Sequence, residues 1–346
     1  MVEYTKTNCA KLVTKVNNKF ATKLLTTLLV LLIVTVIVTP IINVGCQEEK
    51  GQPTSLSSPN PLSSSLVPNM DLDVYIYIKQ DEPTTLPADM IDAPFDVVVE
   101  SLAIWGIHSE DDFAFSGGLS LLSASDASNL YTQITPDKDM WTKLSGNTIY
   151  FVEGSGIAAE SLKRAISKND FKYYDDQKSL KVVAALPDGG ATKLAAVAIV
   201  KPSKALIGRI TGAADTEALG LINLGLKIVG LNVVVAGLYC PHQIDVAEIA
   251  KVIEHEGSIG ESDLGVLILA KSGLPGFIVE PIVKKFLTEA EYAETNLGEL
   301  TIYKGFLDTD DNKAIPVLVR LEGNYIFIAI SGQESYAQTL ITGVNK

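Results

Sequence analysis

The segment from Gly154 to Ala159 has the glycine spacing of a phosphate-binding turn. Its sequence, Gly-Ser-Gly-Ile-Ala-Ala, matches the G-x-G-x-x-A pattern, in which glycines let the backbone approach a pyrophosphate at a helix N-terminus. The segment follows a predicted strand, opens a predicted helix and precedes two acids at 175–176. The candidate nucleotide-binding residues are Gly154, Gly156 and Ala159. A related unit at Ser331 keeps the strand and helix without the glycine pair, so we interpret the glycines as turn residues and expect no cofactor.

Oxygen-bearing side chains alternate at Asp308, Asp310 and Asn312, as they do in a calcium-binding loop. An EF-hand loop would continue with Gly at its sixth position and Glu at its twelfth, where this chain has Lys313 and Val319. We therefore interpret residues 308–313 as a solvated hairpin turn and expect no metal there.

The three histidines, His108, His242 and His255, each lie near acidic residues, but no H-x-x-x-H spacing occurs. A metal site would need three distant segments to converge, so surface or capping roles are expected. The chain contains no G-x-S-x-G motif and no serine followed three residues later by lysine. A catalytic triad assembled from distant segments leaves no such spacing, and a hydrolase of that kind stays open as an alternative.

The elements that must position these groups follow one pattern from Leu72 onward: an aliphatic strand, a short turn, and a helix with apolar residues three and four apart. Two units are alike in detail, at Gly146–Phe151 and Gly323–Ile328. In each, Gly-Asn precedes a strand that continues through Ser-Gly into a helix. We interpret them as a duplicated unit with a boundary near residues 187–192, and convergence on a common hairpin turn is the alternative.

A long apolar segment near the N-terminus predicts attachment to a membrane. Residues 24–45 carry no charge, and at about 1.5 Å per helical residue they cover the hydrocarbon layer of about 30 Å. Five lysines precede the segment and none follows it immediately, so the positive-inside rule places residues 1–23 in the cytoplasm and the rest outside.

The apolar segment ends in Val44, Gly45 and Cys46, which resembles the lipobox of bacterial lipoprotein precursors. In that family a small residue precedes a cysteine that is acylated and becomes the new N-terminus, so the resemblance implies a lipid on Cys46. Asn43 stands where an aliphatic residue is usual, and the apolar run exceeds the usual signal length. An uncleaved signal anchor is the alternative, and both interpretations tether the chain.

Charge and cysteine content restrict the partners of the exported part. The first 46 residues carry a net charge of +4, which leaves −17 on the remainder. Such a module should repel nucleic-acid phosphates and anionic headgroups, so we expect no nucleic-acid partner. Cys240 is the one cysteine of the predicted module, which excludes an internal disulfide and favours a buried apolar role.

The predicted class is α+β, with repeated strand-turn-helix units, antiparallel sheets, helices on one face and two related subdomains. The predicted parts are a cytoplasmic basic region (1–23), the signal or transmembrane segment (24–46), a Ser/Pro-rich disordered linker (47–70) and the subdomains (71–190 and 191–346). We expect a monomeric, extracytoplasmic binding or scaffold module without catalysis, whose partner is the membrane and an envelope lipid, glycan or protein.

The anchor is tested at its cysteine. Replacing Cys46 by Ser should abolish metabolic labelling of the chain with palmitate and leave the precursor uncleaved, because serine offers no thiol for acylation. A Cys9→Ser variant is the matched control and should label normally. Labelling that persists in the Cys46→Ser variant would contradict the lipoprotein interpretation, while the uncleaved anchor would stand.

Overall fold

The computed structural model describes residues 66–78, 84–86, 97–109, 112–133, 140–188, 192–202, 230–240, 264–308 and 314–344. Its helices are α2 (Ala124–Gln133), α3 (Gly156–Lys168), α4 (Gln177–Val183), α8 (Gly276–Glu289) and α9 (Glu334–Thr342). Its strands are β1 (Leu66–Pro68), β2 (Val74–Ile78), β3 (Thr84–Leu86), β4 (Val97–Ser109), β5 (Asp112–Leu121), β6 (Met140–Ser145), β7 (Thr148–Glu153), β8 (Phe171–Tyr173), β9 (Lys193–Val200), β10 (Leu231–Cys240), β11 (Gly265–Ser272), β12 (Ala293–Leu297), β13 (Leu300–Asp308), β14 (Ala314–Glu322) and β15 (Tyr325–Ser331). Among these helices none is long and apolar enough to cross a bilayer. The predicted membrane segment, residues 24–46, lies outside the described residues.

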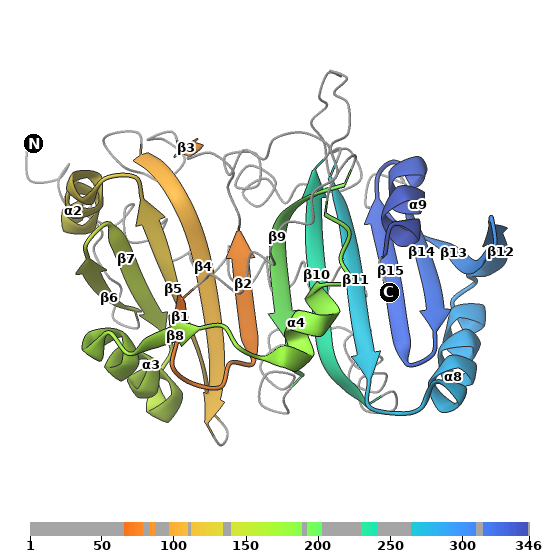
Figure 1. The fold of residues 1–346 in the computed structure, drawn as a ribbon, viewed down its shortest axis with the longest axis horizontal. Coiled ribbons are helices and arrows are strands. Elements are labelled where there is room, and N and C mark those ends of the chain that lie inside the picture. Colours follow the sequence, from red (N-terminus) through yellow and green to blue (C-terminus); the bar gives the residue numbers. More distant parts are fainter. Residues whose placement is uncertain are drawn as a thin grey trace, which may run out of the picture.

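The described strands other than β1 and β8 form one sheet, in the order β12-β13-β14-β15-β11-β10-β9-β2-β4-β5-β7-β6, with β3 paired to β4. The pairings are antiparallel. Figure 1 shows the sheet as one continuous layer with β6 near one edge and β12 near the other. Helices combined with a large antiparallel sheet confirm the α+β class.

The central strands are buried on both faces. In β9 every residue from Leu194 to Val200 is buried, and alternate side chains enter two different cores, Val197 and Ile199 on one face and Ala196 and Ala198 on the other. An unbroken apolar run is the sequence expected of a strand covered on both sides. The sheet is therefore the middle layer of the molecule.

Helices cover both faces of the sheet, and the expectation of helices on one face was wrong. The buried residues of α3, α4 and α9 belong to one core, and those of α2 and α8 belong to the other. Figure 1 shows α3 and α4 in front of the sheet. The physical reason is that apolar side chains on both faces of the strands must be removed from water.

Two segments outside the sheet's centre test local predictions. β13 pairs with β14, and β14 pairs with β15, both antiparallel, and β13 and β14 flank the hairpin turn predicted at residues 308–313. The predicted linker, however, ends too late at residue 70, because Leu66–Pro68 forms β1 and pairs with Phe171–Tyr173 in β8. Val67 is 1% exposed, so burial of this side chain orders the end of a tract whose composition resembles a linker.

The connectivity of the first half of the sheet recurs in the second. The chain runs β2, β4, β5, α2, β6, β7, α3, and these strands lie in the order β2-β4-β5-β7-β6. Later it runs β9, β10, β11, α8, β14, β15, α9 with the β12–β13 hairpin inserted after α8, and the strands lie in the order β9-β10-β11-β15-β14. The corresponding helices share a core: α3 with α9, and α2 with α8.

The two Gly-Asn turns make the same contacts in the two halves. Gly146 and Gly323 have φ values of 62° and 60°, a left-handed conformation that favours glycine. The Asn147 side-chain amide donates to the backbone carbonyl of Leu121 at 2.7 Å, and the backbone carbonyl of Asn147 accepts from the Leu121 N–H at 2.9 Å. Asn324 makes the same two bonds with Ser272, both at 2.9 Å. Each turn thus fixes the last residue of a strand that leads into a helix.

These matched contacts predict matched effects on stability. Replacing Asn147 or Asn324 by Ala should each lower the free energy of unfolding by about 1–2 kcal/mol, because a strand-end carbonyl loses its side-chain donor. Urea unfolding measures both. Asn129→Ala is the control, since that exposed asparagine in α2 should change stability by less than about 0.5 kcal/mol. If one substitution lowers the free energy of unfolding and the other does not, the two turns do not have equivalent roles.

Candidate functional site

A cluster of charged side chains lies at one end of the pairing between β2 and β9, called here the seam. Because β2 begins at Val74 opposite the last residue of β9, Val200, the residues before β2 and after β9 meet. The Lys201 N–H donates to the Asp73 carbonyl at 2.7 Å. Pairing of the two strands therefore brings together groups about 130 residues apart.

His108 and the buried Asp73 form a hydrogen-bonded dyad in this cluster. Gly106 of β4 lies opposite Val74, so His108 reaches just beyond the start of β2. The His108 Nδ1 lies 2.5 Å from Asp73 Oδ2, and Asp73 is 7% exposed whereas the histidine side chain is 45% exposed. Burial raises the pKa of Asp73, and the hydrogen bonds and charge of His108 only partly offset this effect. A carboxylate that orients an imidazole in this way is one part of a general-base system.

Lys201 links the seam to the start of α4. Its Nζ lies 3.0 Å from Asp71 Oδ1 and 2.8 Å from Asp176 Oδ2. Burial would lower the pKa of Lys201, but hydrogen bonds and charge from Asp176 and Asp71 outweigh burial and raise it. For Asp176, burial would raise the pKa, but the hydrogen bonds from Lys201 and Ser179 and the charge of Lys201 lower it.

Asp176 also holds the N-terminus of α4. Its carboxylate accepts from the N–H groups of Lys178 at 3.0 Å and Ser179 at 3.5 Å, and from the Ser179 hydroxyl at 2.9 Å. This is the ordinary role of an aspartate N-cap. Near Asp176, the rings of Tyr174 and Tyr75 pack together with their centroids 4.9 Å apart. Burial raises the pKa of Tyr174 to about 12. The tyrosine stays neutral at physiological pH.

The cluster holds itself together and leaves few groups free for chemistry. Asp73, Asp176, Ser179 and Lys201 each bond to another described residue of the cluster, and the two exposed members are His108, whose side chain is 45% exposed, and Asp71, whose side chain is 94% exposed. In the described part of the chain, His, Cys, Asp and Glu form no group of three or more that could hold a metal ion. The arrangement suits a structural clamp, with a single oriented imidazole at its rim.

The G-x-G-x-x-A segment lies at the start of α3, where a carboxylate already occupies the anion position. The Ile157 N–H donates to Asp112 Oδ2 at 3.0 Å. A Cβ on Gly156 would come within 1.9 Å of that oxygen, and Gly156 has a φ of +79°, so glycine is required there for a reason internal to the fold. Gly154, with a φ of +124°, turns the chain out of β7, and Ala159 is buried in the core.

The other candidate residues are dispersed. Asp308 ends β13 in the strand pair that the predicted hairpin turn joins, while Asp310 and Asn312 lie outside the described residues. His242, His255 and Cys46 also lie outside them. Cys240 is the last residue of β10, opposite Lys193 of β9. Of the three histidines, the structure therefore describes His108.

Sequence reasoning missed most of the seam cluster. Asp73 and Lys201 belong to no motif, and their meeting depends on the pairing of two strands far apart in sequence. A weak signal existed: both residues directly flank apolar strands, at the start of one and at the end of the other. Of the two acids at 175–176 that follow the G-x-G-x-x-A segment, Asp176 caps α4.

Comparison with known proteins assigns no family. No protein-family model and no curated protein matches the chain. Among solved structures, crystal form I of TP0453 covers 82% of this chain and 100% of its own at 11% identity, with a TM-score of 0.32. An N-terminal dehydratase from a difficidin assembly line covers 80% of this chain and 83% of its own at 7% identity, with a TM-score of 0.12. Neither likeness reaches a level that bears on function.

The seam cluster predicts a pH-dependent contribution to stability. Replacing Lys201 by Met should lower the free energy of unfolding by about 1–2 kcal/mol at pH 7, because Asp176 keeps its charge without its cation. The pKa of Asp176 lies below its unfolded value, so this stabilisation exists above about pH 4 and is lost as the pH falls through the folded pKa. The pKa of Lys201 lies above its unfolded value, so its contribution is complete below about pH 10.

Urea unfolding across this range measures the effect. The difference between wild type and Lys201→Met should be largest between about pH 5 and pH 9 and shrink toward pH 3. Lys285→Met is the control, because that lysine is 77% exposed and lies 3.8 Å from Glu289, so its loss should cost less than about 0.5 kcal/mol. Equal costs for the two variants, or a cost independent of pH, would show that the seam pair does not stabilise the fold.

Proposed function

We propose that this chain is a membrane-tethered, extracytoplasmic binding or scaffold protein without catalysis. The observation that carries the proposal is the mutual engagement of the polar groups at the seam. Lys201 bonds to Asp71 and Asp176, and Asp176 in turn caps α4, so these side chains stabilise the fold. Groups that are committed in this way are poorly placed to bind and transform a substrate.

The tether rests on the N-terminal sequence. An uncharged segment at residues 24–45, preceded by lysines and ended by Cys46, supports attachment to a membrane, through an acyl chain or an uncleaved helix. The exported module then reaches an envelope lipid, glycan or protein while it stays attached. The Cys46→Ser labelling experiment decides between the two kinds of anchor.

The architecture within the module supports an internal duplication. The strand order of the first half recurs in the second, and Asn147 and Asn324 make the same pair of contacts. We assign the two related subdomains to the parts before and after the connection between α4 and β9. A duplicated scaffold that shares one sheet offers a broad and rigid surface, which suits binding.

An extracytoplasmic hydrolase is the second candidate, and the dyad of His108 and Asp73 favours it. The carboxylate is buried and the imidazole is half-exposed, which is the arrangement of a general base that faces solvent. A hydrolase would need a nucleophile or an activated water beside His108. The dyad therefore defines where activity should be sought.

One preparation separates the two candidates. A fragment from Ser63 to Lys346 keeps β1 and its partner strand, unlike one that begins at Asn69. On the binding hypothesis, an envelope phospholipid or glycan at about 100 times its Kd should raise the melting temperature by about 5 °C, because only the folded state binds. The same fragment should not hydrolyse generic ester, peptide, phosphate or glycoside probes.

Variants of the dyad make the assay decisive. The non-catalytic proposal would be overturned, and the hydrolase established, by one pattern of turnover. Turnover would disappear in His108→Ala, fall in Asp73→Asn and persist in the control Lys285→Ala. Turnover that survives His108→Ala would point to a contaminant or to another site. If no ligand changes the melting temperature and no probe is hydrolysed, a purely structural role in the envelope is left.

A further inference from the structure

Four exposed cations lie on α3 and α4. Arg164 and Lys168 lie on α3, and Lys178 and Lys181 lie on α4. In the described ranges no carboxylate forms an ion pair with any of them. Three nearby acids are engaged elsewhere, in the pairs Glu160–Lys163, Asp175–Lys172 and Asp176–Lys201, and the fourth, Asp170, accepts a hydrogen bond from the side chain of Asn69 at 3.2 Å. We call these four cations the basic face.

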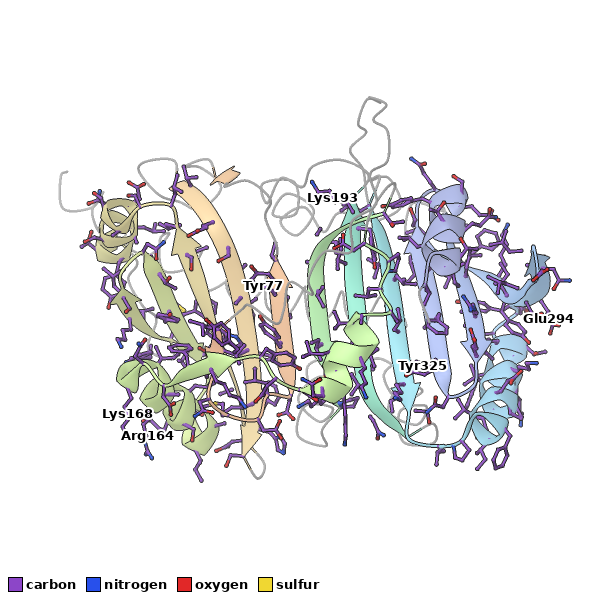
Figure 2. The ribbon with its side chains drawn as sticks, viewed as in Figure 1. Tyr77, Arg164, Lys168, Lys193, Glu294 and Tyr325 are labelled. Carbon is purple, nitrogen blue, oxygen red and sulfur yellow. The ribbon has the colours of Figure 1, made fainter. Side chains whose placement is uncertain are left out.

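The basic face is a local exception on an acidic molecule. Residues 156–185 hold six lysines and arginines against four acids, a net of +2, whereas the chain beyond residue 46 carries −17. The buried residues of α3 and α4 belong to the same core, so both helices cover one face of the sheet. Figure 2 shows Arg164 and Lys168 on the outer side of α3, at the margin opposite Glu294 of β12.

The chain enters the folded module beside this face. β1 begins at Leu66, and β1 pairs with β8, which connects α3 to α4. Nineteen residues, 47–65, separate Cys46 from Leu66. On the prediction that these residues are a disordered linker, their end-to-end distance is about 25 Å, with a limit of about 65 Å. The tether therefore keeps the surface around β1 closer to the membrane than the far edge at β12.

Exposed apolar side chains accompany the cations at the point of entry. Leu66 and Tyr173 lie opposite each other in the β1–β8 pair and are 53% and 62% exposed. Ile157 is 56% exposed and lies on the stripe of α3 that carries Arg164 and Lys168, since positions 157, 164 and 168 fall within one side of a helix. Tyrosine and aliphatic residues beside lysines and arginines are typical of surfaces that contact the interface of a bilayer.

We propose that the basic face docks on the anionic phospholipid headgroups of the membrane that holds the anchor. The inference rests on the proposed tether and adds the orientation of the module. Lysine and arginine near an anionic surface are attracted over about one Debye length, which is about 8 Å at physiological salt. An anchor combined with a basic patch holds a protein more firmly than one acyl chain does. The acidic far edge, where Glu291, Glu294 and Glu299 lie, is repelled and points away.

Acetylation of lysines in the full chain tests this orientation. The purified chain is reconstituted in vesicles of phosphatidylcholine, or of phosphatidylcholine mixed with phosphatidylglycerol, and lysine reactivity is read by mass spectrometry. In the anionic vesicles, the acetylation rates of Lys168, Lys178 and Lys181 should be at least about threefold lower than in phosphatidylcholine, because headgroups cover these lysines. Lys285 on α8 is the internal control and should react equally in both. Salt at about 1 M should restore reactivity, since the Debye length falls to about 3 Å.

A pair of matched variants checks that the cations carry the contact. Lys178→Gln with Lys181→Gln should bring Lys168 reactivity in anionic vesicles close to its value in phosphatidylcholine. Lys284→Gln with Lys285→Gln removes the same charge from α8 and should leave Lys168 protected. If Lys168 loses its protection equally in both double variants, the proposal is overturned, because the protection then depends on net charge and not on this face.

Flotation separates failure of the docking surface from failure of the tether. A chain that floats with phosphatidylcholine and shows equal lysine reactivity in both vesicles keeps the tether and overturns the docking. A chain that floats only with anionic vesicles loses the tether and supports the docking, and one that floats with neither overturns both. A different outcome is that the lysines of the basic face become less reactive as the protein concentration rises in detergent without vesicles. That result would assign the face to contact with a second copy of the chain and would also overturn the proposal.

Discussion

The antiparallel pairing of β2 with β9 is the contact on which the rest of the structure depends. Each of these strands would otherwise be the edge of a shorter sheet, with a row of unpaired backbone N–H and C=O groups. Their register, from Val74 opposite Val200 to Ile78 opposite Ala196, joins the two halves into one layer. It also buries alternate side chains of both strands in two cores, so the halves share their apolar interior.

The same pairing decides where the charged groups meet. Asp73 and Lys201 flank the paired strands, and their backbone hydrogen bond continues the sheet by one step. The side chains then extend the connection to β4 through His108 and to α4 through Asp176. Partial burial makes each of these contacts stronger than an exposed ion pair and makes an unpaired member costly. The cluster therefore reinforces the seam at the end where the strands would fray.

Charge is distributed unevenly over this fold, and that distribution has more bearing on function than the net value. The overall charge of −13 describes an acidic chain, yet α3 and α4 present exposed cations, and their neighbours Glu160 and Asp175 are paired with other lysines. Fields near a surface follow the local arrangement of charges, since salt screens contributions beyond about 8 Å. On our proposal, an anchored chain then settles with its basic face toward anionic headgroups, whereas an expectation based on net charge alone would predict repulsion.

The amino-acid sequence by itself determined the local elements, because apolar periodicity and turn chemistry act over a few residues. The α+β class was predictable, as were the turns at Gly146 and Gly323 and the strand and helix that follow each of them. Tertiary structure alone decided that helices cover both faces, that β1 lies within the supposed linker, and that His108 contacts Asp73. Gly156 of the G-x-G-x-x-A segment makes room for the carboxylate of Asp112, which lies about 45 residues earlier. Such contacts depend on which distant strands pair, and pairing is set by the shared burial of whole faces, which no short stretch of residues encodes.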